Sequence, residues 1–333
     1  MIRTIAAGYD CVDVNHAQLL ENDTQALISE HGSSQIIWYN FTHHNLDKRS
    51  VVFTIGGDDG TWPIVDFDHS VQWPPGTSVW KGQHNAEYMG EDEIWMMDNL
   101  GLGNVSRLLI ARLDHANHKV YLEWEYNLGV KTHDFGDADP TPSGNVLGAF
   151  WASKWGPKTR LGGSAQAGLV EVTRDSKEVA WQLLVQGFEC SSSNGICDHC
   201  DSDDDDDFDD FRHDKLDDDS AVSDVGGWLI YSAERFYTRP VLPSPNSKNR
   251  PHCHDGQLYF TVFNSYKQST RFPGYFEVKE DKDNGEILAA GDFMFKAHWR
   301  PTEVKTSISY DGLVQLKVTN QRGRSVTQSL TCY

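Results

Sequence analysis

Short segments rich in aromatic and β-branched residues, bounded by Gly, Asp, Asn or Pro, recur along the whole chain. This pattern is typical of β-strands, because rings and branched side chains pack well on a pleated surface. The predicted strands cover residues 35–41, 50–57, 93–99, 106–113, 119–127, 145–153, 178–185, 227–237, 257–266, 275–280, 304–310 and 313–320. Residues 15–31 have helix-like spacing of apolar positions, but Asn22-Asp23-Thr24 interrupts it, so we expect two strands and a turn. The sequence therefore predicts an all-β fold.

Two sets of residues recur at similar intervals, an aromatic set within strands and a polar set near strand starts. The aromatic set is Phe53, Trp124 and Trp181, and the polar set is His16, His84, Asn145 and Arg235. An interval near 60 residues that tolerates insertion is typical of a β-propeller, whose blades surround a central channel. The alternative is that any tryptophan-rich β protein yields such an alignment.

The composition and the spacing of predicted strands change near residue 250. The polar segment "LPSPNSKNRPH" precedes closely spaced strands that run to Tyr333. We expect a propeller-type domain over residues 1–245 and a small C-terminal β-sandwich over residues 250–333.

The net charge of −20 is concentrated in one low-complexity segment. Residues 198–219 hold 13 Asp against one Arg and one Lys, so we expect residues 190–222 to form a solvated, disordered acidic insert. Its spacing fits no calcium-binding loop. The acidic remainder makes nucleic acid an improbable partner, and the chain has neither an apolar run of membrane-spanning length nor a clear signal peptide.

Cysteines cluster within this acidic region, beside one histidine. They are Cys190, Cys197 and Cys200, with His199 between the last two. A single C-x2-C without a second ligand pair favours a disulfide or free thiols over zinc, and we predict no metal and no cofactor. Three N-x-S/T triplets give weak support for a secretory route; they begin at Asn22, Asn40 and Asn104.

The polar landmarks combine imidazoles, amides and arginine, a set that suits an anion that is attacked and released. A neutral histidine can attack and form a covalent intermediate, and a second histidine can protonate the leaving oxygen. Amide and guanidinium donors stabilise charge on the transferred group. The sequence runs are "DVNHAQ", "QHNAEYMGEDEIWMMDN", "VSRLLIARLD", "VYLEWEYN", "PSGNVLGAFW" and "GWLIYSAERFY".

In this order and spacing, these runs resemble the arylsulfate sulfotransferases over roughly residues 10–240, with a further similar run at 293–302. The resemblance implies a six-bladed propeller that moves a sulfuryl group from a phenolic sulfate ester to a phenol, without a nucleotide sulfate donor. It also implies an extracellular or secretory location.

The resemblance places the sulfated histidine at His84 and the supporting histidine and amide at His16 and Gln18. On this hypothesis His84 carries the sulfuryl group, while His16 assists the leaving phenolate and later deprotonates the acceptor. The remaining predicted substrate-binding residues are Asn85, Asn145, Arg107 and Arg235.

The sequence departs from the family pattern in three respects. Gln18 stands where the family usually has Asn, and His31 stands where it has Arg, which removes an always-charged donor. About four blade equivalents fit in 240 residues, so we expect the propeller to be open or to lack its first blades.

Several alternatives remain open at this level. The chain could be a propeller that binds or scaffolds without catalysis, or a hydrolase that uses Glu87 with Asp98. Arg107 could instead pair with Asp98, and Arg235 with Glu234, while Asn145 could close a tight turn.

Overall fold

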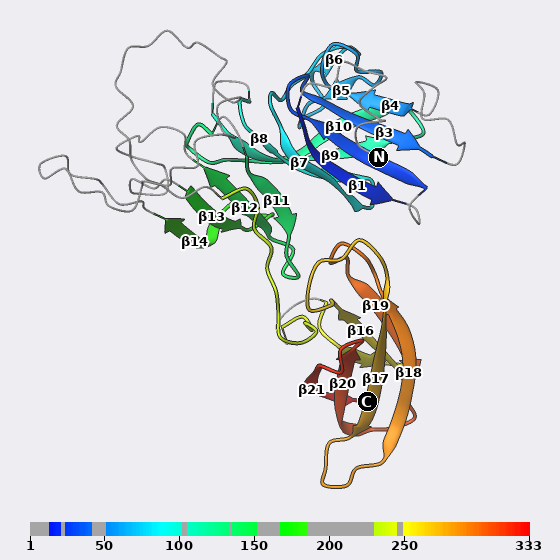
Figure 1. The fold of residues 1–333 in the computed structure, drawn as a ribbon. Helices are drawn as coiled ribbons and strands as arrows, with labels where there is room; N and C mark the ends of the chain where they lie inside the picture. Colours follow the sequence, from blue (N-terminus) through cyan, green and yellow to red (C-terminus); the bar gives the residue numbers. More distant parts are fainter. Residues whose placement is uncertain are drawn as a thin grey trace, which may run out of the picture.

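The computed structural model describes residues 13–20, 24–41, 51–101, 105–132, 135–151, 167–185, 230–244 and 249–333. Within these ranges the regular elements are all β-strands, so the predicted all-β class is confirmed (Figure 1). The described part of the chain contains no helix long and apolar enough to cross a membrane. The acidic insert, its cysteines, and the triplets at Asn22 and Asn104 lie outside the described residues.

The N-terminal part consists of three successive antiparallel meanders. The first sheet runs in the order β1 (Val14–Leu20), β2 (Gln25–Glu30), β3 (Gln35–Asn40) and β4 (Val51–Ile55). The second contains β7 (His84–Gly90), β8 (Glu93–Asp98), β9 (Arg107–Asp114) and β10 (Lys119–Asn127), extended by β5 (Ile64–Val65) and β6 (Gln72–Trp73). The third is β11 (Asp137–Pro140), β12 (Val146–Trp151), β13 (Ala167–Val172) and β14 (Val179–Val185). The two strands and turn predicted over 15–31 are confirmed as β1 and β2.

The three sheets pack face to face through two hydrophobic cores. Leu27 and Phe53 of the first sheet share a core with Met96 of the second. Met97, from the other face of β8, packs with Phe150 of the third sheet. Because successive side chains of a strand point to opposite faces, the second sheet is buried on both sides and reads as nearly continuous apolar runs.

Residues 252–332 form two further sheets around their own core. One contains β15 (His252–His254), β16 (Gln257–Val262) and β19 (Thr302–Ser307). The other runs in the order β18 (Ile287–Phe295), β17 (Phe272–Glu280), β20 (Gly312–Asn320) and β21 (Ser325–Cys332). A disulfide between Cys253 and Cys332 joins the two sheets. We call this unit the C-terminal sandwich; the predicted domain boundary near 245–250 stays a prediction.

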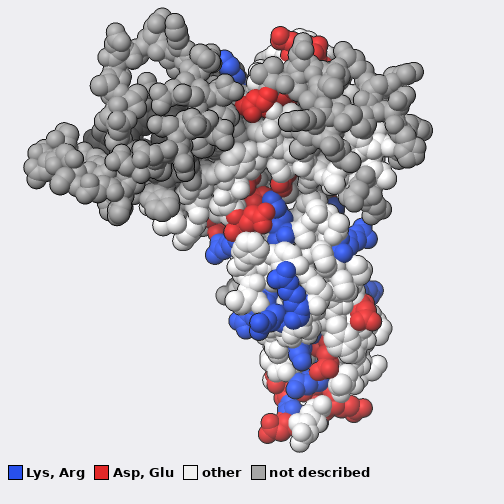
Figure 2. All heavy atoms as spheres, viewed as in Figure 1, with Lys and Arg blue, Asp and Glu red and all other residues white. Residues whose placement is uncertain are grey.

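The predicted strand over 227–237 is not a regular strand in its described part. Residues 230–244 instead run as an extended strap toward the C-terminal sandwich, with an isolated bridge from Phe236 to Tyr266 (Figure 1). The side chain of Phe236 is largely exposed, so the aromatic pattern of this segment does not mark a core strand. Figure 2 shows acidic and basic side chains gathered where the upper sheets meet the C-terminal sandwich.

Candidate functional site

The first strands of the three N-terminal sheets come together in space. β7 contacts both β1 and β11, and each of these strands is the edge of its own sheet. They carry buried polar side chains, including His84 and Asn85 on β7 and Asp137 and Asp139 on β11. Buried polar groups need partners, so their contacts define what this region can do.

A bulge in β7 brings two of these side chains to one face. In its pairing with β8, His84 lies opposite Met97, and Glu87 lies opposite Trp95. Met97 and Trp95 share a core, so His84 and Glu87 also point to one face, although a regular strand would place them on opposite faces. Asn85 provides the bulge in a left-handed conformation with φ of 46°.

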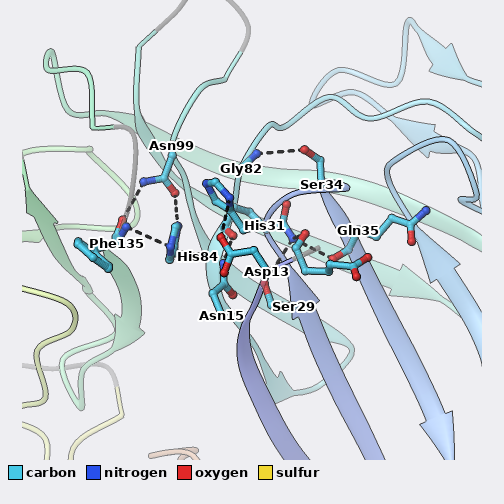
Figure 3. A network of polar contacts seen from close by, with 12 residues as sticks. Asp13, Asn15, Ser29, His31, Ser34, Gln35, Gly82, His84, Asn99 and Phe135 are labelled. Carbon is cyan, nitrogen blue, oxygen red and sulfur yellow. Dashed lines mark hydrogen bonds and ion pairs between the residues drawn. The ribbon is translucent and has the colours of Figure 1, made fainter. Parts of the chain in front are cut away.

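His84 is buried and held in one tautomer. Its Nδ1 lies 2.9 Å from Oδ1 of Asn99, and its Nε2 accepts a hydrogen bond of 3.1 Å from the backbone N–H of Phe135 (Figure 3). Nδ2 of Asn99 donates to the Phe135 carbonyl at 2.8 Å, which fixes the orientation of the amide. An amide oxygen can only accept, so the proton is on Nδ1 and the lone pair on Nε2.

The histidine that packs against His84 is His31, in the turn between β2 and β3. The two ring centroids are 4.8 Å apart. Nδ1 of His31 lies 3.2 Å from Oδ2 of Asp13, and the backbone N–H of His31 donates to the Asp13 carbonyl at 2.9 Å (Figure 3). Gly82 makes room for this ring, because a Cβ there would lie 2.8 Å from Nε2 of His31.

Aromatic rings complete the surroundings of His84. Tyr231 lies 6.0 Å and Phe135 lies 5.9 Å from the His84 ring, centroid to centroid. The Tyr231 hydroxyl donates to the Asn15 carbonyl at 2.6 Å. Burial raises the pKa of Tyr231, and the carboxylates of Asp13 and Asp137 raise it further, so the hydroxyl keeps its proton at neutral pH.

An open cavity of about 710 Å³ has a lining that includes neither His84 nor His31. Its lining includes Ser33, Ser34, Lys81 and Leu100, which are close sequence neighbours of His31, Gly82 and Asn99. A volume of this size accommodates a small organic molecule.

His16 belongs to a second, ionic cluster. Its Nε2 lies 3.2 Å from Oε1 of Glu87, a contact whose angle does not make a hydrogen bond. Lys267, from the loop between β16 and β17, places its Nζ 2.9 Å from Glu87 and 2.5 Å from Asp139. The C-terminal sandwich thus contributes a nearly buried cation to the space between β1, β7 and β11.

The carboxyl groups of the ionic cluster have divergent proton affinities. Burial raises the pKa of Glu87, but contact with His16 and the charge of Lys267 outweigh it and hold the value at about 2. Burial raises the pKa of Asp139 to about 6 despite Lys267, and burial with the charge of Asp139 raises that of Asp137 well above its usual range. Glu87 is therefore ionised at neutral pH, whereas Asp137 and Asp139 take up a proton more readily than exposed carboxyl groups do.

The side-chain amide of Gln18, which was predicted to bind substrate, forms hydrogen bonds between two strands. Gln18 accepts from the backbone N–H of Tyr88 at 2.8 Å and donates to its carbonyl at 3.1 Å, which joins β1 to β7. Asn85, in contrast, is buried and its Oδ1 has no hydrogen-bond partner in the described part of the chain.

The guanidinium group of Arg107 donates hydrogen bonds to three acceptors in or near the second sheet. It donates to Asp98 at 2.7 Å, to Glu125 at 2.6 Å and to the Val79 carbonyl at 2.7 Å. The structure therefore contains the ion pair with Asp98 that was the alternative to a substrate-binding role. The carboxylates of Glu87 and Asp98 bind different cations, Lys267 and Arg107 respectively.

Asn145 and Arg235 meet at Glu171. Nδ2 of Asn145 donates to Glu171 at 2.7 Å, and Arg235 forms an ion pair with the other carboxylate oxygen. This group ties the strap to the third sheet, and the partner of Arg235 is Glu171, not Glu234. Both side chains thus have structural partners.

Several residues with contacts in these two clusters were not assigned roles from the sequence. They include Asp13, His31, Tyr231 and Lys267. In the sequence, Asp13 stood out only as part of "DVNHAQ". His31 stood out only because the arylsulfate sulfotransferases, which the sequence resembles, have an arginine there. No local signal marked Lys267, because its partners lie 180 and 128 residues away.

The described residues include no group of three or more His, Cys, Asp or Glu side chains arranged to hold a metal ion.

Comparisons with known proteins leave the family unassigned. No family model and no curated protein matches the sequence. A protein assigned as a 6-phosphogluconolactonase of Bacteroides fragilis aligns with 51% of this chain and 39% of its own, at 11% identity and a TM-score of 0.30. β-Glucosidase 3B of Thermotoga neapolitana aligns with 31% of this chain and 16% of its own, at 13% identity and a TM-score of 0.18. A β-glucosidase of Listeria innocua aligns with 34% of this chain and 19% of its own, at 10% identity and a TM-score of 0.19. This chain spans less than half of each structure, and scores this low support no functional argument.

Proposed function

We propose that this chain is an arylsulfotransferase-like protein of propeller type, which moves a sulfuryl group from a phenolic sulfate ester to a phenol through His84. Three successive four-stranded meanders, with their first strands side by side, are the arrangement that propeller blades have around a channel. The sequence resemblance adds the six-bladed ring, of which the described part would supply three blades, and the division into residues 1–245 and 250–333.

The observation that carries this proposal is the fixed tautomer of His84. Asn99 binds the proton on Nδ1, so the nucleophilic lone pair is on Nε2 without prior proton removal. A second imidazole backed by a carboxylate lies beside it, which is the nucleophile, base and orienting-group pattern of covalent catalysis. His31 stands where the arylsulfate sulfotransferases have an arginine. This difference from the family pattern therefore lies beside the proposed nucleophile, His84.

The proposed reaction begins with attack of Nε2 of His84 on sulfur. Attack requires the backbone N–H of Phe135 to release Nε2, which it bonds at 3.1 Å. The S–O bond breaks, its electron pair goes to the departing phenolate, and the proton stays on Nδ1 of His84, hydrogen-bonded to Oδ1 of Asn99. An acceptor phenol then loses its proton to a base and attacks sulfur, and the N–S electron pair returns to Nε2 of His84.

A second candidate function is ligand binding without turnover. The observation that favours it is the same Phe135 hydrogen bond, which occupies the lone pair that catalysis would use. The commitment of Arg107 and Gln18 to structural partners also removes two predicted sulfuryl ligands.

Mass spectrometry after incubation with 4-nitrophenyl sulfate distinguishes the two functions. Sulfuryl transfer predicts a gain of one sulfuryl group on the peptide that contains His84, and loss of this gain in His84→Gln. His254→Gln is the matched control, because that histidine lies exposed on the C-terminal sandwich. Release of 4-nitrophenol by His84→Gln would contradict the assignment, and saturable binding of the ester without transfer would support the second function.

We also propose a secretory or extracellular location. The Cys253–Cys332 disulfide supports it, because such bonds persist mainly in oxidising compartments. Non-reducing peptide mapping of the protein from its native source tests this: finding both cysteines as free thiols would contradict it.

A further inference from the structure

We propose that His31, together with Asp13, is the acid–base catalyst of the reaction proposed for His84. This inference rests on the proposed function and moves the acid–base role from His16 to His31. The reason is geometric: the His31 ring packs on His84 at 4.8 Å between centroids, whereas His16 pairs with Glu87 in the ionic cluster.

Asp13 and His31 are fixed to each other at two points. The Asp13 carboxylate contacts Nδ1 of His31 at 3.2 Å, and the Asp13 carbonyl accepts the His31 backbone N–H at 2.9 Å. Asp13 has φ of 70°, a strained conformation for a residue other than glycine, and such strain clusters at functional sites. A carboxylate beside Nδ1 orients the imidazole ring, as the carboxylate of a catalytic triad orients its histidine.

Gly82 makes this approach possible. Its φ of 60° and its missing side chain let Nε2 of His31 lie against the backbone two residues before His84. The N–H of Gly82 donates to Oγ of Ser34 at 3.1 Å, which ties the His31 turn to the segment that carries the nucleophile (Figure 3). His31 is about one-fifth exposed, so its ring is reachable from outside.

The charged and titratable groups around His31 are mainly acidic or neutral. Asp13 faces it from the start of β1, His84 from β7, and Tyr231 of the strap lies near Asp13. Glu30 precedes it but hydrogen bonds with Ser33. The charged group in contact with the His31 ring is therefore the Asp13 carboxylate.

The proton balance follows from these positions. As the S–O bond breaks, Nε2 of protonated His31 gives its proton to the departing phenolate oxygen, and His31 becomes neutral. In the second step neutral His31 takes the proton of the acceptor phenol while its oxygen attacks sulfur. His31 therefore returns to its starting state after each transfer.

A leaving-group comparison tests this assignment. The 4-nitrophenolate ion leaves without a proton, whereas unsubstituted phenolate needs one. General acid catalysis contributes about 10²–10⁴-fold, so the rate of His84 sulfation, measured without an acceptor, should fall about 100-fold or more in His31→Gln with phenyl sulfate and less than about 10-fold with 4-nitrophenyl sulfate. Asp13→Asn should show the same preference with a smaller loss.

His31→Arg separates proton transfer from charge. Arginine keeps a positive charge at this position but does not give up its proton at ordinary pH. We expect it to keep the KM for the ester and to retain the phenyl sulfate defect. Recovery of wild-type turnover with phenyl sulfate in His31→Arg, or equal losses with both esters in His31→Gln, would overturn the acid–base role.

Sulfation of His84 keeps the two proposals distinguishable. Labelling of His84 by 4-nitrophenyl sulfate in His31→Gln would show that the variant is folded and its nucleophile is intact. If the wild-type protein itself gains no sulfuryl group on His84, the proposed function fails, and the role of His31 fails with it. If the wild type is labelled and the leaving-group preference is absent, only the present inference is overturned.

Discussion

Replacement of Lys267 by methionine should destabilise the protein strongly, because it leaves two buried carboxylates without their cation. The side chain of Lys267 is 10% exposed, and its Nζ contacts Glu87 at 2.9 Å and Asp139 at 2.5 Å. At an effective dielectric constant near 20, each contact corresponds to about 6 kcal/mol of gross attraction. Desolvation offsets most of it, and breaking a buried ion pair costs about 3–5 kcal/mol in practice.

The cost should depend on pH in a defined direction. The pKa of Asp139 is about 6, so below that value this carboxyl group is neutral and no longer needs the cation. Glu87, with a pKa of about 2, stays ionised. We therefore expect the loss of unfolding free energy in Lys267→Met to be about 3–5 kcal/mol at pH 7 and roughly half of that at pH 5.

Urea unfolding at the two pH values measures this difference. Lys282→Met is the matched control, because Lys282 pairs with Glu280 at 2.7 Å but is 60% exposed, and water screens such a pair so that it contributes little to stability. A triple variant with Glu87→Gln and Asp139→Asn should recover much of the loss. Equal effects of the two lysine replacements at pH 7 would refute the reasoning.

Three further predictions concern stability. Burial lowers the pKa of His298 to about 4, so as pH falls below 6.5 the unfolded chain gains a proton before the folded one. His298→Asn should therefore reduce the loss of unfolding free energy between pH 7 and pH 4.5 by about 2 kcal/mol. An unchanged loss in this variant would contradict the prediction. Arg107→Lys cannot serve three acceptors and should cost about 3 kcal/mol in urea unfolding, whereas the half-exposed Arg112 should tolerate the same change within about 1 kcal/mol. The disulfide closes 79 residues, so Cys253→Ala with Cys332→Ala should cost about 4.5 kcal/mol, and dithiothreitol should lower the Tm of the wild type but not of this double variant.

The fold class followed from the sequence because most core strands have an apolar pattern of their own. The strand predicted at 119–127 is confirmed as β10 with the same bounds, and that at 106–113 is shifted by one residue in β9. The strands that were missed include β7 and β11. Their interiors hold buried polar residues such as His84, Glu87 and Asp139, which interrupt the alternation that marks a strand.

The composition of the candidate site was predictable only in part. The interval pattern and the resemblance led to His84, which the structure places among buried polar residues of three strands. The neighbours of His84 depend on how separate sheets pack, since His31 and Asn99 come from the turn after β2 and the end of β8. The sequence indicates which residues are candidates for catalysis. It does not show that His16 contacts Glu87 while His31 packs against His84.

The bridge from Gln18 to both backbone groups of Tyr88 has a consequence for solubility. β1 and β7 are edge strands, and the unpaired N–H and C=O groups of an edge strand can recruit another chain and start aggregation. A side-chain amide carries the same donor and acceptor as a peptide group, so Gln18 occupies this stretch of β7 without adding a strand. Gln18 thus protects part of the β7 edge from pairing with another chain.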